Sequence, residues 1–142
     1  MKNGGGLEMN TDIKFYRDKD NRVMAILIPS EYKDYGSSFI TDNEEYQQIA
    51  YMKHKKGHEI TPHYHNKFTR NIDYTCETLV IRKGILEVRL FEEKVEIYRF
   101  VIKTGDILTL LSGGHGFLAL DDIEMIEIKQ GPFVGTLDKT RF

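Results

Sequence analysis

Hydrophobic and polar residues alternate with a period of two along most of this chain. In ILEVRLF at residues 85–91, leucine and valine side chains alternate with charged ones, which is typical of a β-strand with one buried face. FYRDKDNRVMAILI indicates a first hairpin, because the polar stretch RDKDNR separates its two apolar halves. The other segments that we predict to be extended are QQIAYMKH, EITPHYH, CETLVIRKG, ILEVRLF, VEIYRFVI, DILTLL, GFLALD and IEMIEIKQ.

Turn signals separate these segments, and helix is scarce. Glycine, serine and acidic residues gather at KKGH, KG, EEK, TGD, SGG and DD, as expected between strands. The best helical candidate is TDNEEYQQ at residues 41–48, where Asp42 can cap a helix; the alternative is a turn before a strand. Short strands at intervals of about 8–12 residues favour an all-β sandwich or barrel. We find no linker or repeat in residues 11–142, so we predict one all-β domain there, after a flexible lead-in at residues 1–10.

Composition and charge exclude several classes of protein. The 142 residues are 40% hydrophobic and 30% charged, with a formal net charge of -2, and this balance lacks the positive charge of a nucleic-acid-binding protein. No apolar run approaches the ~20 residues that span a bilayer. Cys76 is the single cysteine, so no internal disulfide can form. We therefore expect a cytoplasmic protein that binds neither nucleic acid nor membranes.

Histidine and glutamate provide the candidate chemistry. His63 and His65 are separated by one residue, and in a strand such residues point to the same face, where two imidazoles can chelate one ion. Glu77 opens the next apolar run, and His115 lies in the glycine-rich segment SGGHGF. Three imidazoles and one carboxylate suit a divalent transition metal, namely Fe, Mn, Ni, Co or Zn. The alternative is a solvated histidine pair at the surface, with Glu77 at a solvated strand edge.

Two stretches resemble the motifs of a known family. The first combines a glycine, a His-x-His pair, a glutamate and a second glycine: Gly57, His63, His65, Glu77 and Gly84. The second runs from Gly105-Asp106 through an apolar strand to His115. Together they resemble the cupin superfamily, small β-barrels of jelly-roll (double-stranded β-helix) type that hold a metal at one end. The C-terminal segment IEMIEIKQGPFVGTLDKTRF resembles short cupins linked to polysaccharide and sugar-nucleotide pathways.

The resemblance implies a cupin-type barrel at residues 11–142 with His63, His65, Glu77 and His115 as metal ligands. It departs from the family pattern in two places. Eleven residues separate His65 from Glu77 where the family has three or four, and in the second motif Leu111 stands where a proline is common, with His115 one residue early. Glu77 is therefore a ligand only if the extra residues form an excursion between paired strands. Such barrels often dimerise, so we expect a homodimer, with Val80 and Phe91 as interface candidates.

The extra residues after His65 carry basic side chains. Lys67 and Arg70 lie a few residues from the histidine pair, and a guanidinium pairs well with carboxylate or phosphate. We therefore predict that Lys67 and Arg70 bind a small anionic substrate. The alternative is a solvated loop whose basic residues keep the rim of the barrel soluble.

Three functions are compatible with these residues. The first is a metal-dependent enzyme of isomerase, lyase or dioxygenase type acting on a small, oxygen-rich, anionic or sugar-derived substrate. The second is a non-catalytic module that contains a metal and binds a sugar or metabolite. The third is a metal-free isomerase with His63 as base, which the presence of all four ligand residues disfavours.

Overall fold

The computed structural model describes residues 12–142, and the lead-in predicted at residues 1–10 lies outside this part of the chain. The described residues form ten strands and one short 3-10 helix. The elements are β1 (Lys14–Arg17), β2 (Val23–Ile28), β3 (Ser38–Phe39), β4 (Ala50–Tyr51), β5 (Glu77–Lys83), β6 (Ile85–Glu92), β7 (Val95–Lys103), β8 (Ile107–Leu110), β9 (Gly114–Ala119), β10 (Glu124–Lys129) and η1 (Gly135–Asp138). The predicted all-β class is confirmed.

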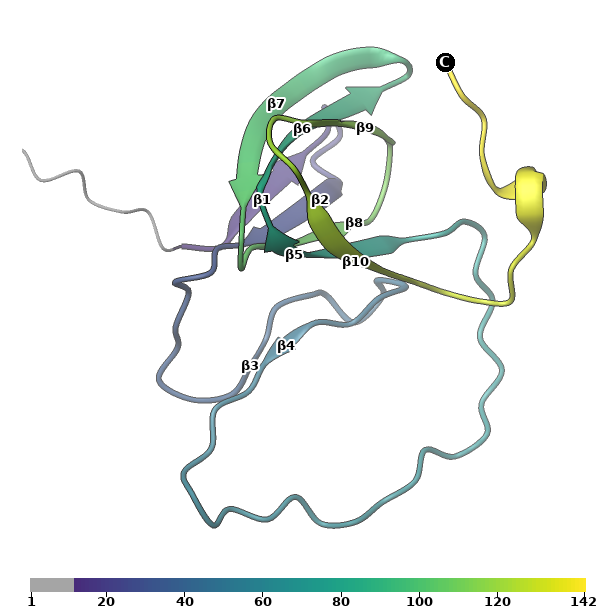
Figure 1. The fold of residues 1–142 in the computed structure, drawn as a ribbon. Coiled ribbons are helices and arrows are strands. Elements are labelled where there is room, and N and C mark those ends of the chain that lie inside the picture. The colour runs from purple at the N-terminus through teal and green to yellow at the C-terminus, as the bar shows by residue number, and fades with distance from the viewer. Residues whose placement is uncertain (1–11) are drawn as a thin grey trace, which may run out of the picture.

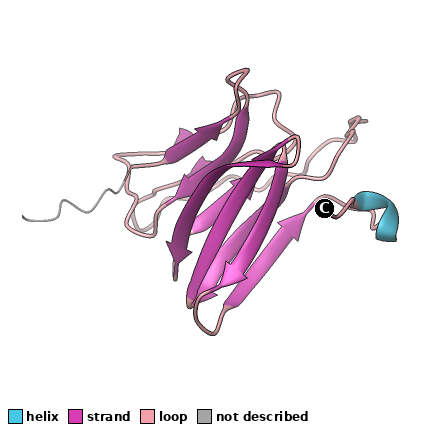
Figure 2. Cartoon of the chain, turned by 90° about the horizontal axis from the view of Figure 1, so that it is seen from above, coloured by secondary structure: helices cyan, strands magenta, loops and turns pink. Residues whose placement is uncertain are grey.

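The strands form three antiparallel sheets arranged in layers (Figure 1). A five-stranded sheet has the order β1-β2-β8-β5-β10, and a three-stranded sheet has the order β7-β6-β9. The hairpin β3–β4 lies on the other side of the five-stranded sheet from β7, β6 and β9 (Figure 1). Seen from above, the helix η1 stands apart from the sheets beside the C-terminus (Figure 2).

Two apolar cores follow from strand alternation. The larger core lies between the five-stranded and three-stranded sheets and contains Leu79, Val88, Leu90 and Leu108, each at most 1% exposed. The smaller core covers the opposite face of the five-stranded sheet, where Ile26 and Leu111 pack against Ile40. The strand β2 contributes to both cores, with Ala25 and Leu27 in the larger one and Val23 and Ile26 in the smaller one.

The predicted turns are also present. Glu93 and Lys94 both have positive φ, at 48° and 69°, which makes a two-residue hairpin between β6 and β7. Gly84 has a φ of 93°, and a Cβ at this position would collide with the carbonyl oxygen of Asp122. Glycine is required there for both reasons.

Two predicted elements are wrong. Residues 41–48 form turns and bends rather than a helix, and the segment EITPHYH lies in coil. We call residues 52–72 the arm, because every one of them is exposed and none belongs to a strand. The apolar side chains of the arm are four or eight residues apart, at residues 52, 60, 64, 68 and 72. The buried face of a strand has one at every second position, so this spacing is too sparse for a strand. Pro62 also lacks the amide hydrogen that a sheet ladder needs.

The two main sheets remain open along one side. The strand β9 pairs only with β6, and β10 pairs only with β5. Each therefore has one free edge within the described chain, and the closed barrel stays a prediction. No helix in residues 12–142 has the length and apolarity needed to cross a membrane.

Candidate functional site

Glu77 and His115 meet at the open side of the molecule. Glu77 is the first residue of β5 and faces the larger core with Leu79, whereas His115 projects from β9 on the same side as Leu90, its register partner. His115 Nε2 lies 3.3 Å from Glu77 Oε2, with the side chains 30% and 8% exposed, respectively. Two of the four predicted ligands, from strands that are far apart in sequence, are thus brought together.

The surroundings favour the ionised form of Glu77. The hydrogen bond from His115 holds the pKa of the Glu77 carboxyl below its usual range and outweighs the opposing effect of burial. Lys139 and Lys129 act in the same direction through their positive charge. Glu77 is therefore a buried carboxylate that keeps its charge, which is the form that ligates a metal.

A pocket of about 960 Å³ opens beside this pair. Its apolar wall includes Leu79, Leu110 and Phe117, and its polar wall includes Arg89 as well as the Glu77–His115 pair. This volume lies at the upper end of the range for small-molecule sites, about 300–1,000 Å³. The pocket extends around the free edge of β9. Its lining includes His115, on the face of β9 that points to the larger core, and Gly116, on the opposite face.

His63 and His65 lie away from this pocket. Their rings are neighbours, with centroids 5.4 Å apart, so their spacing pairs the imidazoles even without a strand. Both belong to the arm, which extends from the β3–β4 side of the five-stranded sheet, away from β9 (Figure 1). Within residues 12–142, no three His, Cys, Asp or Glu side chains are close enough together to hold a metal.

The two basic residues predicted to bind substrate also lie on the arm. Lys67 and Arg70 are exposed, neither lines the pocket, and the Arg70 guanidinium lies 5.3 Å from the ring centroid of Phe68. With the arm in this position, neither residue can contact a ligand beside Glu77. Their predicted role therefore depends on movement of the arm.

Sequence reasoning missed the contribution of the C-terminal segment. We call residues 135–142 the strap, because its Lys139, Arg141 and Phe142 form one wall of the pocket. The ring of Phe142 packs edge-on against Phe91, with centroids 5.2 Å apart. The sequence offered only the two basic residues of DKTRF as a hint. They do not predict that this segment folds back onto the pocket. Phe91, an interface candidate, is half-buried in this arrangement.

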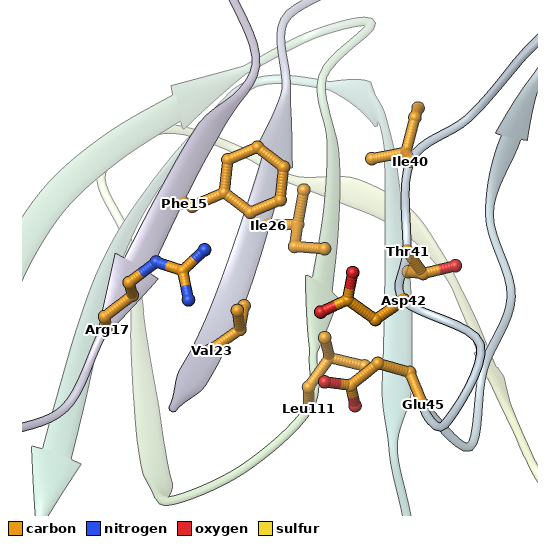
Figure 3. Close-up of a pocket in the computed structure, with 9 residues that line it drawn as sticks. All are labelled: Phe15, Arg17, Val23, Ile26, Ile40, Thr41, Asp42, Glu45 and Leu111. Carbon is orange, nitrogen blue, oxygen red and sulfur yellow. The ribbon is translucent and has the colours of Figure 1, made fainter. Parts of the chain in front are cut away.

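A second, smaller hollow of about 170 Å³ lies between β1 and the loop after β3 (Figure 3). The carboxylates of Asp42 and Glu45 face the Arg17 side of this hollow (Figure 3). Arg17 donates a hydrogen bond to the carbonyl of Asn21 at 3.0 Å. Burial raises the pKa of Glu45.

Comparison of the chain with protein-family models, with curated proteins and with solved structures finds no match. The functional argument consequently depends on the geometry of the Glu77–His115 pocket.

Proposed function

We propose that the protein binds a divalent transition metal with Glu77, His115, His63 and His65, and that it acts in the manner of a small cupin on an oxygen-rich ligand. The observation that supports this is the contact between Glu77 and His115 in a large open pocket, 3.3 Å apart. These two residues come from the two motifs that resemble the cupin family. A metal ion would give this buried carboxylate a further charged partner besides His115.

The arm is long enough to bring the other two ligands. Thr75 lines the pocket, and His65 precedes it by ten residues, a stretch that can span up to ~33 Å. The free edge of β9 can accept a further backbone segment through main-chain hydrogen bonds. In the proposed metal-bound state, the arm lies along this edge, with His63 and His65 facing His115.

The chain's own residues define what such a site does. The bound metal would chelate substrate oxygens and polarise a carbonyl group. Glu77 and His115 hold their positions through strand pairing, whereas Leu79, Leu110 and Phe117 exclude water from one side of the pocket. A small, anionic or sugar-derived substrate fits these walls, and the reaction class is an isomerisation, lyase or dioxygenase reaction.

A second candidate function is a non-catalytic binding module. The pocket contains two carboxylates besides Glu77, and each is already engaged. Glu127 pairs with Lys129 at 3.1 Å, and Asp138 accepts a hydrogen bond from Thr75 at 2.5 Å. Because acid–base catalysis needs a group that is available for proton transfer, these pairings favour a protein that binds its ligand without converting it.

Elemental analysis of untagged protein tests the metal proposal. We expect about one transition-metal ion per chain in the wild type and loss of the ion in His63→Ala/His65→Ala and in Glu77→Gln/His115→Ala. His54→Ala/His58→Ala is the matched control, because it removes two arm histidines outside the motif, and it should retain the ion. A wild type without metal, or equal metal content in all four proteins, would contradict the proposal.

A further inference from the structure

Four basic side chains without ion-pair partners in the described chain line the pocket beside Glu77 and His115, and one of them, Arg22, lies over the ring of Tyr74, 5.2 Å from its centroid. We propose that Arg89, Lys139 and Arg141 bind a small oxyanion, a carboxylate or phosphate group, in this pocket. This inference names the ligand class of the proposed metal site and rests on the proposed function for the ligand's position. The anion binding itself does not require the metal.

Arg89 carries a donor that lacks a partner. It lies on β6 opposite Gly116 of β9, and a Cβ added to Gly116 would lie 3.5 Å from Nη2 and 3.8 Å from Nε of Arg89. The Arg89 guanidinium thus lies beside Gly116 at ordinary van der Waals distance. Arg89 Nε is buried and makes no hydrogen bond within the described chain. A buried donor without a partner is unfavourable, and an anion in the pocket would satisfy it.

The strap holds the other two basic residues between two anchors. On one side of them, Asp138 accepts a hydrogen bond from Thr75. On the other side, the Phe142 ring packs against Phe91, and a Cβ added to Gly114 would lie 3.0 Å from this ring. Lys139 and Arg141 lie between these anchors and line the pocket. Two fixed ends reduce the entropy that these side chains lose on binding a ligand.

The acidic side chains of the pocket have partners within the described chain, whereas its lysine and arginine side chains do not form ion pairs there. Its three carboxylates are all engaged, with His115, Lys129 and Thr75 as the partners. Among the basic residues of the described chain, Lys19, Arg99, Lys103 and Lys129 form ion pairs, whereas Arg89, Lys139 and Arg141 do not. Lys139 acts on Glu77, and Arg89 on Glu96, through its charge. An anion in the pocket would give these three side chains a direct, charge-assisted partner.

Isothermal titration calorimetry on the full chain, freed of metal by a chelator, tests this inference. The probes are inorganic phosphate and malonate, each titrated at constant ionic strength maintained with NaCl. We expect saturable binding, weakened about tenfold for each lost charge-assisted bond in Arg89→Gln and in Lys139→Gln/Arg141→Gln. Arg82→Gln, a basic residue on β5 outside the pocket, is the control and should bind as the wild type does. The stronger of the two probes identifies the anion class.

The inference is overturned if neither probe binds saturably, or if the pocket variants bind as tightly as Arg82→Gln. It is also overturned if only Lys67→Gln/Arg70→Gln weakens binding, because the anion would then belong to the arm. Binding that appears only after metal is restored, and that the pocket variants do not weaken, would assign the anion to the metal instead. Metal content, measured on samples before chelation, reports separately on the proposed function.

Discussion

Glu77 is the residue at which the needs of binding and of stability differ. Its carboxylate is almost buried between Leu79 and Leu110 and has His115 as its near partner. A charge in such a place contributes little net stability, because its desolvation offsets much of the attraction to its partner. The same feature makes it suitable as a metal ligand.

Replacing Glu77 by leucine should therefore leave the fold intact while abolishing metal binding. We expect the melting temperature of Glu77→Leu to equal or exceed that of the wild type, since apolar replacement of buried polar pairs is often neutral or stabilising. Differential scanning calorimetry measures this. Leu108→Ala is the reference for a destabilised core, because Leu108 is fully buried. The free energy of unfolding of this variant should fall by about 2–5 kcal/mol. A loss in Glu77→Leu as large as that would contradict the argument.

The lowered pKa of Glu77 predicts a specific dependence on pH. A carboxyl whose pKa is lower in the folded than in the unfolded state stabilises the fold above its unfolded pKa, and this contribution disappears as the pH falls through its folded pKa. We expect Glu77→Gln to lack this contribution, so its free energy of unfolding should approach that of the wild type below about pH 4. Urea titrations between pH 3 and 7 measure the difference. A difference that is constant over this range would contradict the lowered pKa.

At the scale of single residues, the sequence predicted half of the site. Alternation places Glu77 and His115 at fixed positions in strands, but that the two meet was expected only from the cupin resemblance. His63 and His65 could not be placed, because their segment lacks the apolar face that fixes a strand against a sheet. Lys139 and Arg141 were missed, because no periodic pattern follows the return of a chain terminus to a pocket.

At the scale of elements, alternation and turn chemistry identify the strands that form the two main sheets. The arm is the exception, and its chemistry explains why. Between residues 52 and 72 there are five basic side chains and one carboxylate, so the segment is well solvated and gains little from packing alone. Its ends are anchored by aromatic contacts, Tyr51 with Tyr32 and Tyr74 with Tyr46. An ion that the arm's histidines share with Glu77 would supply the missing attraction.

Limited trypsinolysis detects such a movement of the arm. Lys53, Lys55, Lys56, Lys67 and Arg70 are all exposed, so the metal-free protein should be cut first within the arm. Added Ni²⁺ or Co²⁺ should slow this cleavage in the wild type and leave it unchanged in His63→Ala/His65→Ala, as followed by mass spectrometry. Equal protection of both proteins would show that the metal does not act through these histidines.

At the scale of the whole molecule, the open side between the two main sheets is the central feature. The free edges of β9 and β10 cannot be predicted from alternation, because the sequence pattern of a strand is the same whether it has one neighbour or two. The described fold is a layered all-β structure, and closure of a cupin barrel requires a further segment on β9. In the proposed metal-bound state, the arm occupies this position.

The outer face of β10 supports the prediction of a homodimer. Ile126 and Ile128 are 45% and 52% exposed, and Ile126 pairs with Val80, an interface candidate. Apolar residues along an exposed sheet edge are commonly covered by a second chain. We expect sedimentation velocity to show a dimer for the wild type and a monomer for Ile126→Lys, with Ile60→Lys on the arm as a control that stays dimeric. A monomeric wild type would contradict this prediction.

X-ray absorption spectroscopy of the Co²⁺-loaded, untagged protein tests the central claim most directly, because it counts the imidazoles bound to the ion. The account predicts three imidazoles with an oxygen ligand in the wild type, from His63, His65, His115 and Glu77. It predicts two imidazoles in His115→Ala and no specifically bound Co²⁺ in His63→Ala/His65→Ala. A wild-type spectrum that the His115→Ala and Glu77→Gln substitutions leave unchanged would show that the ion binds elsewhere.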